Sequence, residues 1–253
     1  MSTHPRTADR IAQAIRLAGG TAGSGRRGRK TYLLGIDGML FGDDPRDGVR
    51  KGRVFAHSSI GFRFTVPPAY VLFNSPQAVV ARGPGKSEIQ FDMEAEKKAT
   101  KVGDLVAYLK RDWGQSLSLG GIERITVGGM EAATGQARMS TRDGTRDVRL
   151  VAIRDDRRRI FRLLFLTPTA VTARQAEALQ RTTYSFRLLS AGEAAAIRPL
   201  RLRIITVGSG DTRQSLADRL PFEDLRHEWF ETLNGLAPGQ LLAPGEKVKI
   251  VAE

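Results

Sequence analysis

The feature that most constrains the fold is a run of apolar residues that alternate with polar ones between about residues 55 and 190. Successive side chains of a β-strand point to opposite faces, so a spacing of two residues predicts strands with one face buried. The alternating positions are Phe62, Phe64 and Val66, then Val71 and Phe73, and then Ile89, Phe91 and Met93. Each apolar face needs a partner layer to cover it, which predicts a layered fold.

Helical spacing occurs twice in the same region. Apolar residues three or four positions apart between Val102 and Trp113 predict a helix with one apolar face, which we expect to cover a sheet. A second helix is predicted from Thr172 to Thr183, and a short strand follows it. Further strands are predicted at residues 122–127, 132–139, 146–154 and 160–167. Strands and helices in this order predict an α+β fold.

The tail is predicted to fold as strand, helix, helix and strand. Its first strand lies in the run LRLRIITV. Asp211 is expected to cap the first helix, because Gln214 follows three residues later in a capping-box arrangement. The second helix runs from about Phe222 to Leu233, and an Asn-Gly pair predicts its end. The closing strand is predicted from Lys247 to Val251.

These patterns divide the chain into four parts. Residues 1–30 contain an amphipathic helix from Thr7 to Ala18, followed by a Gly/Arg-rich linker that we expect to be a mobile loop. Residues 31–54 are interpreted as a connecting segment. The sandwich domain is predicted at residues 55–192 and the small tail module at residues 200–253.

The composition excludes several classes of protein. No apolar run approaches the roughly 20 residues that cross a bilayer, so the sequence predicts no membrane span. The first residues lack the apolar stretch and cleavage site of a secretory signal, so the chain as written is expected to carry no signal peptide. Because the chain has no cysteine, disulfides, thiol catalysis and cysteine-ligated metal sites are excluded.

The net charge of +13 raises the question of a polyanionic partner. Residues 191–253 hold 8 Lys and Arg against 9 Asp and Glu, so the basic excess lies upstream of the tail. The densest clusters are residues 26–30 (RRGRK) and 157–159 (RRR), and solvated loops account for both. We therefore expect no nucleic-acid binding. Binding of a polyanion, such as nucleic acid, a teichoic-type polymer or lipid headgroups, stays the alternative, and it would weaken with salt.

Three short motifs in the tail suggest a family. They are V-x-x-G-D-T at residues 207–212, L-N-G at 233–235 and P-G-x-x-V-x-I at 244–250. Their order resembles the LysM module, a small β-α-α-β fold associated with N-acetylglucosamine polymers. The resemblance implies a shallow sugar-binding groove between the loop after the first strand and the loop before the second. By position its residues would be Gly210, Asp211, Thr212, Leu241 and Leu242.

Two further resemblances cover the rest of the chain. The segment GFRFTVPPAYVLFN, the hairpin after it and the closing helix with SFRLL resemble the PsbP-like α/β sandwich in element order. The N-terminal segment THPRTADRI resembles the T-H-P-x-x-x-x-R-I segment that ends the catalytic domain of zinc endopeptidases related to HtpX and the CAAX prenyl protease. Bacterial periplasmic members of that group carry a PsbP-like region and a terminal LysM-like repeat. The resemblance assigns supporting catalytic roles to His4 and Arg10.

The chain departs from that family at the zinc site. Such a site needs H-E-x-x-H, with two His one helical turn apart, and a third ligand downstream. The chain contains only three histidines, and Glu231 stands where the second His would follow His227. We therefore predict that this chain has no metal ligands, no cofactor and no activity by itself. The resemblance assigns zinc to the parent family.

The resemblance thus implies that the chain is the non-catalytic C-terminal region of a periplasmic zinc metalloendopeptidase, in which protein substrates would bind to the missing catalytic domain. Its LysM-like tail would attach to peptidoglycan or to substrate. The alternative is a free-standing cell-envelope protein that binds peptidoglycan and has no enzymatic activity.

Overall fold

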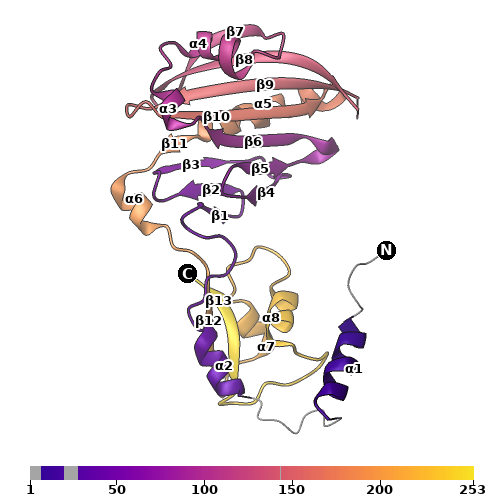
Figure 1. The fold of residues 1–253 in the computed structure, drawn as a ribbon. Helices are drawn as coiled ribbons and strands as arrows, with labels where there is room; N and C mark the ends of the chain where they lie inside the picture. The colour runs from indigo at the N-terminus through magenta and orange to yellow at the C-terminus, as the bar shows by residue number, and fades with distance from the viewer. Residues whose placement is uncertain (1–6, 20–27, 143) are drawn as a thin grey trace. The chain divides into compact units, whose positions relative to one another are not determined.

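The computed structural model describes residues 7–19, 28–142 and 144–253. The chain forms two compact units (Figure 1). The smaller unit takes residues from both ends of the chain, up to Met39 and then Leu202–Leu220 and His227–Ile250. The larger unit contains Leu40–Arg201, Pro221–Arg226 and Val251–Glu253.

The larger unit is built on two antiparallel sheets. A four-stranded sheet has the order β1-β2-β3-β11, and a seven-stranded sheet has the order β4-β5-β6-β10-β9-β8-β7. The strands of the first sheet are β1 (Val49–Lys51), β2 (Val54–His57), β3 (Phe62–Thr65) and β11 (Arg187–Leu188). Those of the second are β4 (Val71–Asn74), β5 (Val79–Arg82), β6 (Glu88–Met93), β7 (Gly120–Val127), β8 (Met130–Thr141), β9 (Gly144–Arg154) and β10 (Ile160–Pro168). The predicted α+β class is thus confirmed. Strand β1 lies within residues 31–54, which were interpreted as a connecting segment, so the sheet begins earlier than predicted.

Phenylalanine rings fill the space between the two sheets. Phe62 on β3 lies with its ring centroid 4.9 Å from that of Phe91 on β6 and 5.4 Å from that of Phe161 on β10. Phe64, two residues further on, also packs against Phe91 at 4.9 Å. The alternation predicted at Phe62 and Phe64 is confirmed, since both are buried.

The alternation predicted in β4 is wrong by one residue. Val71 and Phe73 are 60% and 47% exposed, whereas Leu72 between them is 4% exposed. Leu72 pairs with Ala81 of β5 and faces the core, because the register of this edge strand is set by its neighbour. Phe73 instead lies on the outer side under the guanidinium of Arg82, 5.2 Å from the ring centroid.

The opposite face of the seven-stranded sheet is covered by a short helical segment. Helix α4 (Leu105–Tyr108) continues directly into the π-helical turn η2 (Leu109–Trp113), after the short helix α3 (Glu96–Ala99). Leu105 and Leu109 are fully buried against β8 and β9 residues, as the helical spacing predicts. The helix begins later than predicted, because Val102 precedes the N-cap Asp104, whose carboxylate accepts the Ala107 N–H at 2.8 Å.

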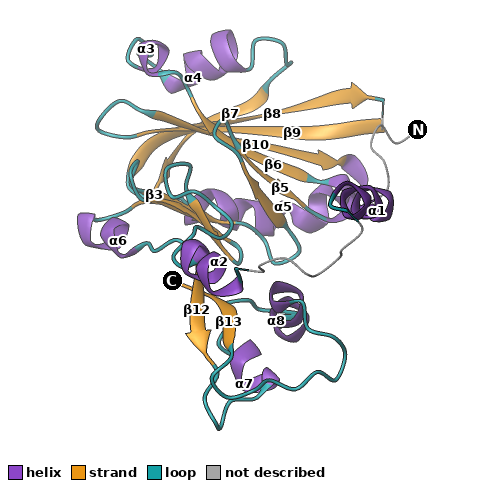
Figure 2. Ribbon diagram, turned by 60° about the horizontal axis from the view of Figure 1, so that its bottom comes forward, coloured by secondary structure: helices purple, strands orange, loops and turns teal. Residues whose placement is uncertain are grey.

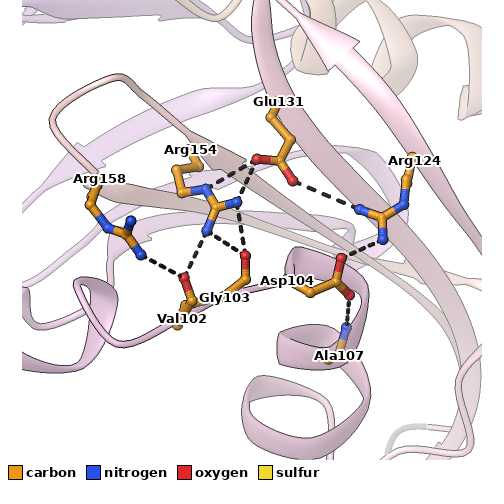
Figure 3. A network of polar contacts seen from close by, with 8 residues as sticks. All are labelled: Val102, Gly103, Asp104, Ala107, Arg124, Glu131, Arg154 and Arg158. Atoms are coloured by element: carbon orange, nitrogen blue, oxygen red, sulfur yellow. Dashed lines mark hydrogen bonds and ion pairs between the residues drawn. The ribbon is translucent and has the colours of Figure 1, made fainter.

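A polar network fastens this segment to the sheet (Figure 3). Arg154 of β9 donates to the carbonyls of Val102 at 2.8 Å and Gly103 at 3.1 Å, just before α4. Its guanidinium also pairs with Glu131 of β8 at 2.5 Å. On the other side of Glu131, Arg124 of β7 binds the capping carboxylate of Asp104. The network therefore holds the start of α4 against three strands.

Helix α5 (Thr169–Ser185) closes the larger unit and leads into β11. It packs against β3, β9 and β10, and its buried residues include Leu179 and Thr182. Two short helical segments complete this unit, η1 (Pro84–Lys86) and α6 (Ala191–Ala196). The predicted helix from Thr172 to Thr183 is confirmed, three residues longer at its start.

The smaller unit has the predicted order of elements in its tail. Strand β12 (Arg201–Thr206) is followed by α7 (Arg213–Ala217), α8 (Arg226–Asn234) and β13 (Lys247–Ala252), and β12 and β13 form a two-stranded sheet (Figure 2). The N-terminal part adds α1 (Thr7–Leu17) and α2 (Arg29–Ile36). Helix α2 was not predicted, because Arg29 and Lys30 were interpreted as part of a loop.

Candidate functional site

The first predicted ligand loop follows β12 and ends at the start of α7. Asp211 does not cap that helix as predicted. Its carboxylate instead accepts the N–H of Gly208 at 2.7 Å and closes the loop. Thr212 is the N-cap: its hydroxyl accepts the Ser215 N–H at 3.0 Å, and the Ser215 hydroxyl accepts the Thr212 N–H at 2.9 Å. The helix therefore starts one residue later than the sequence suggested, and Gly210 is exposed in the loop.

The second predicted ligand loop connects α8 to β13. Gln240 closes a turn in it, because its side-chain oxygen accepts the N–H of Ala237 at 3.1 Å. Leu241 comes next and is 87% exposed. Within the part of the chain that the structure describes, the backbone N–H groups of Leu241 and Leu242 donate to no protein acceptor. Donors of this kind, beside an exposed apolar side chain, are available to a ligand.

Arg213 joins the two loops. Its Nη1 donates to the carbonyl of Gln240 at 3.1 Å, which ties the first turn of α7 to the residue before Leu241. The same guanidinium contacts Glu231 of α8, whose Oε1 atom also lies 2.9 Å from His227 Nε2. The structure thus brings the two predicted ligand loops together. Sequence reasoning missed Arg213, for which the only signal is a basic residue directly after the V-x-x-G-D-T motif.

The predicted catalytic pair cannot be assembled from the structure. His4 lies outside the described residues. Arg10 is exposed on α1, a helix without buried residues. Their assigned roles in a zinc site therefore stay predictions.

A separate cavity of about 250 Å³ lies in the larger unit, with Phe55, Phe62 and Phe91 among its lining residues. His57 and Asp47 contribute polar groups to its wall. The Nδ1 atom of His57 accepts the N–H of Ile60 at 3.3 Å, which leaves the ring proton on Nε2 in the neutral form. Burial lowers the pKa of His57 from its ordinary value of 6.5, although the Asp47 carboxylate and the Arg46 backbone oppose this effect.

Two further properties bear on function. Among residues 7–19, 28–142 and 144–253, no three His, Asp or Glu side chains gather in a way that could hold a metal ion. No helix in the same residues is both long and apolar enough to cross a bilayer.

Comparisons with known proteins concern the fold alone. No protein-family model and no curated protein matches the sequence. The chain is similar to the solution structure of cyanobacterial PsbP (CyanoP) from Synechocystis sp. PCC 6803, with 15% identity and a TM-score of 0.42 over 58% of this chain and 98% of that chain. It is also similar to LpqN of Mycobacterium tuberculosis, a protein involved in cell envelope biogenesis, with 16% identity and a TM-score of 0.36 over 51% and 83% of the two chains. A protein from Bacteroides thetaiotaomicron VPI-5482 has 14% identity and a TM-score of 0.42, over 74% of this chain and 60% of that one. The solved structures that resemble this chain thus include a PsbP-like protein.

Proposed function

We propose that the tail binds glycans that contain N-acetylglucosamine, such as peptidoglycan, through the two loops that Arg213 joins. The contact of Arg213 with the Gln240 carbonyl supports this proposal, because it fixes the exposed Leu241 beside the loop of Gly210 to Thr212. An N-acetyl group presents one N–H, one carbonyl and one methyl group. The unpartnered N–H groups of Leu241 and Leu242 can bind the carbonyl, and the Leu241 side chain can cover the methyl group.

In the context of the sequence resemblance, we propose that this binding attaches the non-catalytic C-terminal region of a periplasmic zinc endopeptidase to the cell wall. On this proposal the chain contributes no zinc ligand to such an enzyme, as the absence of H-E-x-x-H in its sequence predicts. Purified by itself, it is expected to hold no stoichiometric zinc and to cleave no protein substrate. Measurable peptidase activity of the purified chain would contradict this part of the proposal. The second candidate, a free-standing peptidoglycan-binding protein, shares the glycan site.

Calorimetric titration with an N-acetylglucosamine hexamer, together with co-sedimentation on purified peptidoglycan, tests the glycan site. We expect Leu241→Asp to weaken hexamer binding roughly five- to thirtyfold, because it removes an apolar contact worth about 1–2 kcal/mol. Leu34→Asp is the matched control, since Leu34 lies on α2 of the same unit and is 66% exposed. It should leave binding unchanged.

Three results would overturn the proposal. One is that the unaltered chain binds neither the hexamer nor peptidoglycan. A second is that both variants lose binding to the same extent. A third is that retention collapses with salt and occurs equally on heparin, which would favour the polyanion alternative, because phosphate and sulfate contacts weaken steeply with ionic strength.

A further inference from the structure

A groove of about 390 Å³ lies on the outer face of the four-stranded sheet, on the side away from the phenylalanine core. The pairing of β1, β2, β3 and β11 places Val49, Ala56, Arg63 and Arg187 in one row across this face. Ala196, at the end of α6, and the following Ile197 contribute to the other wall. The volume falls in the range typical of small-molecule sites.

The row ends in two like charges. Arg63 of β3 and Arg187 of β11 are direct antiparallel partners, and like charges in such positions destabilise a sheet. Glu193 of α6 neutralises only one of them, because both of its carboxylate oxygens accept from Arg187, at 2.6 and 3.0 Å. This ion pair and a hydrogen bond to Ser190 hold the pKa of Glu193 at about 2, so the carboxylate is charged at neutral pH.

Arg63 has no such partner. In the part of the chain that the structure describes, its guanidinium forms no ion pair and no hydrogen bond with another residue. Among the described residues, Arg198 on the opposite wall donates only to the backbone carbonyl of Ala195, at 2.6 Å. The remaining cation, Lys51, is paired with Glu253. Among the side chains that line the groove, four are cationic and two are carboxylates, and the cations without a carboxylate partner are Arg63 and Arg198.

We propose that this groove binds a free small molecule with an anionic head, a phosphate monoester or carboxylate, and a short alkyl or acyl body. Arg63 and Arg198 would bind the head by charge-assisted hydrogen bonds, which are the stronger class of polar contact. The apolar residues of the row and of the α6 wall would cover the body. The site is independent of the glycan site, which lies in the other unit.

Titration calorimetry of the full chain with octyl phosphate and octanoate tests the proposal. Arg63→Gln keeps the stem of the side chain and removes its charge, so we expect octyl phosphate affinity to fall at least roughly tenfold. Arg157→Gln is the matched control, an exposed arginine in the β9–β10 hairpin of the same unit. Ala196→Phe should also weaken binding, because it fills the apolar part of the groove. Circular dichroism would confirm that each variant is folded.

Comparison ligands define the outcomes that would overturn the proposal. Inorganic phosphate bound as tightly as octyl phosphate would show that the apolar body is not recognised. Octyl glucoside bound as tightly would show that the charge is not recognised. The proposal would also be overturned if octyl phosphate did not bind, or if Arg157→Gln lowered its affinity as much as Arg63→Gln does. The chain could instead bind phosphatidylglycerol vesicles in a way that depends on Arg63, and fail to bind free octyl phosphate. That result would show that the ligand is a bilayer surface, and it would contradict the proposal of a free small molecule.

Discussion

At the scale of single residues, Arg154 makes the most contacts in the network at α4. Its guanidinium donates to two backbone carbonyls and to Glu131, and its side chain is 15% exposed. The carbonyls of Val102 and Gly103 lie just outside the helix, so no helical N–H is available to them. Arg154 therefore stabilises the loop by satisfying acceptors that the helix itself cannot satisfy.

Replacement of Arg154 by Met should destabilise the larger unit by about 1–3 kcal/mol, because it leaves the Gly103 carbonyl without its donor and the Val102 carbonyl with only Arg158, while it keeps an apolar stem. Urea unfolding followed by Trp113 fluorescence, in a Trp229→Phe background, would measure this change in the larger unit. Arg157→Met, at an exposed position of the adjacent hairpin, should change the free energy of unfolding by less than about 0.5 kcal/mol. Equal effects of the two substitutions would show that the network does not stabilise the fold.

The cap of α7 shows what the sequence could not decide at this scale. Asp211 and Thr212 are both good N-cap residues, and each has a suitable partner three positions later, Gln214 or Ser215. The choice depends on Gly208, whose N–H is satisfied by the Asp211 carboxylate. That contact depends on the path of the loop, which local spacing does not specify. The sequence therefore placed the start of α7 to within one residue and gave the capping role to Asp211 instead of Thr212.

At the scale of elements, the alternating pattern located the strands of the sandwich. It predicted the wrong buried face only for the edge strand β4. In β3 the pattern of Phe62 and Phe64 is unambiguous, because polar residues separate them. In β4 three apolar residues follow one another, so alternation does not decide which of them faces the core. Pairing with β5 decides it, since Leu72 lies opposite the buried Ala81. Similarly, helical spacing predicted the buried face of α4 and missed its start, which depends on the Asp104 cap.

The observed register of β4 predicts that Leu72 contributes more to stability than Phe73. The sequence pattern predicts the opposite order. Leu72→Ala should cost about 2–5 kcal/mol of unfolding free energy, because it opens a cavity in the core. Phe73→Ala should cost at most about 1 kcal/mol, the size of the exposed contact between its ring and Arg82. Urea unfolding at Trp113, again with Trp229 replaced by Phe, compares the two variants directly. A larger cost for Phe73→Ala would restore the register predicted from the sequence.

At the scale of the whole molecule, the smaller unit combines segments from the two ends of the chain. Arg29 of α2 donates to the carbonyl of Lys247 in β13 at 3.1 Å, a contact between residues 218 positions apart. Asp37 accepts the N–H of Ile204 in β12 at 3.0 Å, and Leu33 is buried. Local patterns carry no information about such distant partners. For this reason the sequence predicted the β-α-α-β order of the tail and left α2 out of the unit.

The charges of the larger unit determine how stability depends on pH. Burial lowers the pKa of His57 below 6.5, so its proton is bound less tightly in the folded state than in the unfolded state. For Glu94, burial acts in the opposite direction, but hydrogen bonds from Tyr108 and Lys98 outweigh it and lower the pKa below 4.5. In both cases the unfolded state binds more protons, so stability is fully present above the unfolded pKa and is lost as pH falls. As the pH falls, protonation of His57 is therefore the first of the two to lower the stability, and protonation of Glu94 lowers it further only in more acidic solution.

We therefore expect the free energy of unfolding of the larger unit to be lower at pH 5.5 than at pH 7.5, a window that contains the ordinary pKa of His57, 6.5, and lies above that of Glu94, 4.5. His57→Asn should reduce this difference, because Asn keeps an acceptor for the Ile60 N–H and cannot take up a proton. Urea unfolding at the two pH values, with Trp113 as the only tryptophan, measures the effect, and His227→Asn in the smaller unit is the matched control. A pH dependence that persists unchanged in His57→Asn would show that another group governs it. Since His57 lies in the wall of the aromatic cavity, such a result would also mean that this cavity admits the imidazolium without cost to the fold.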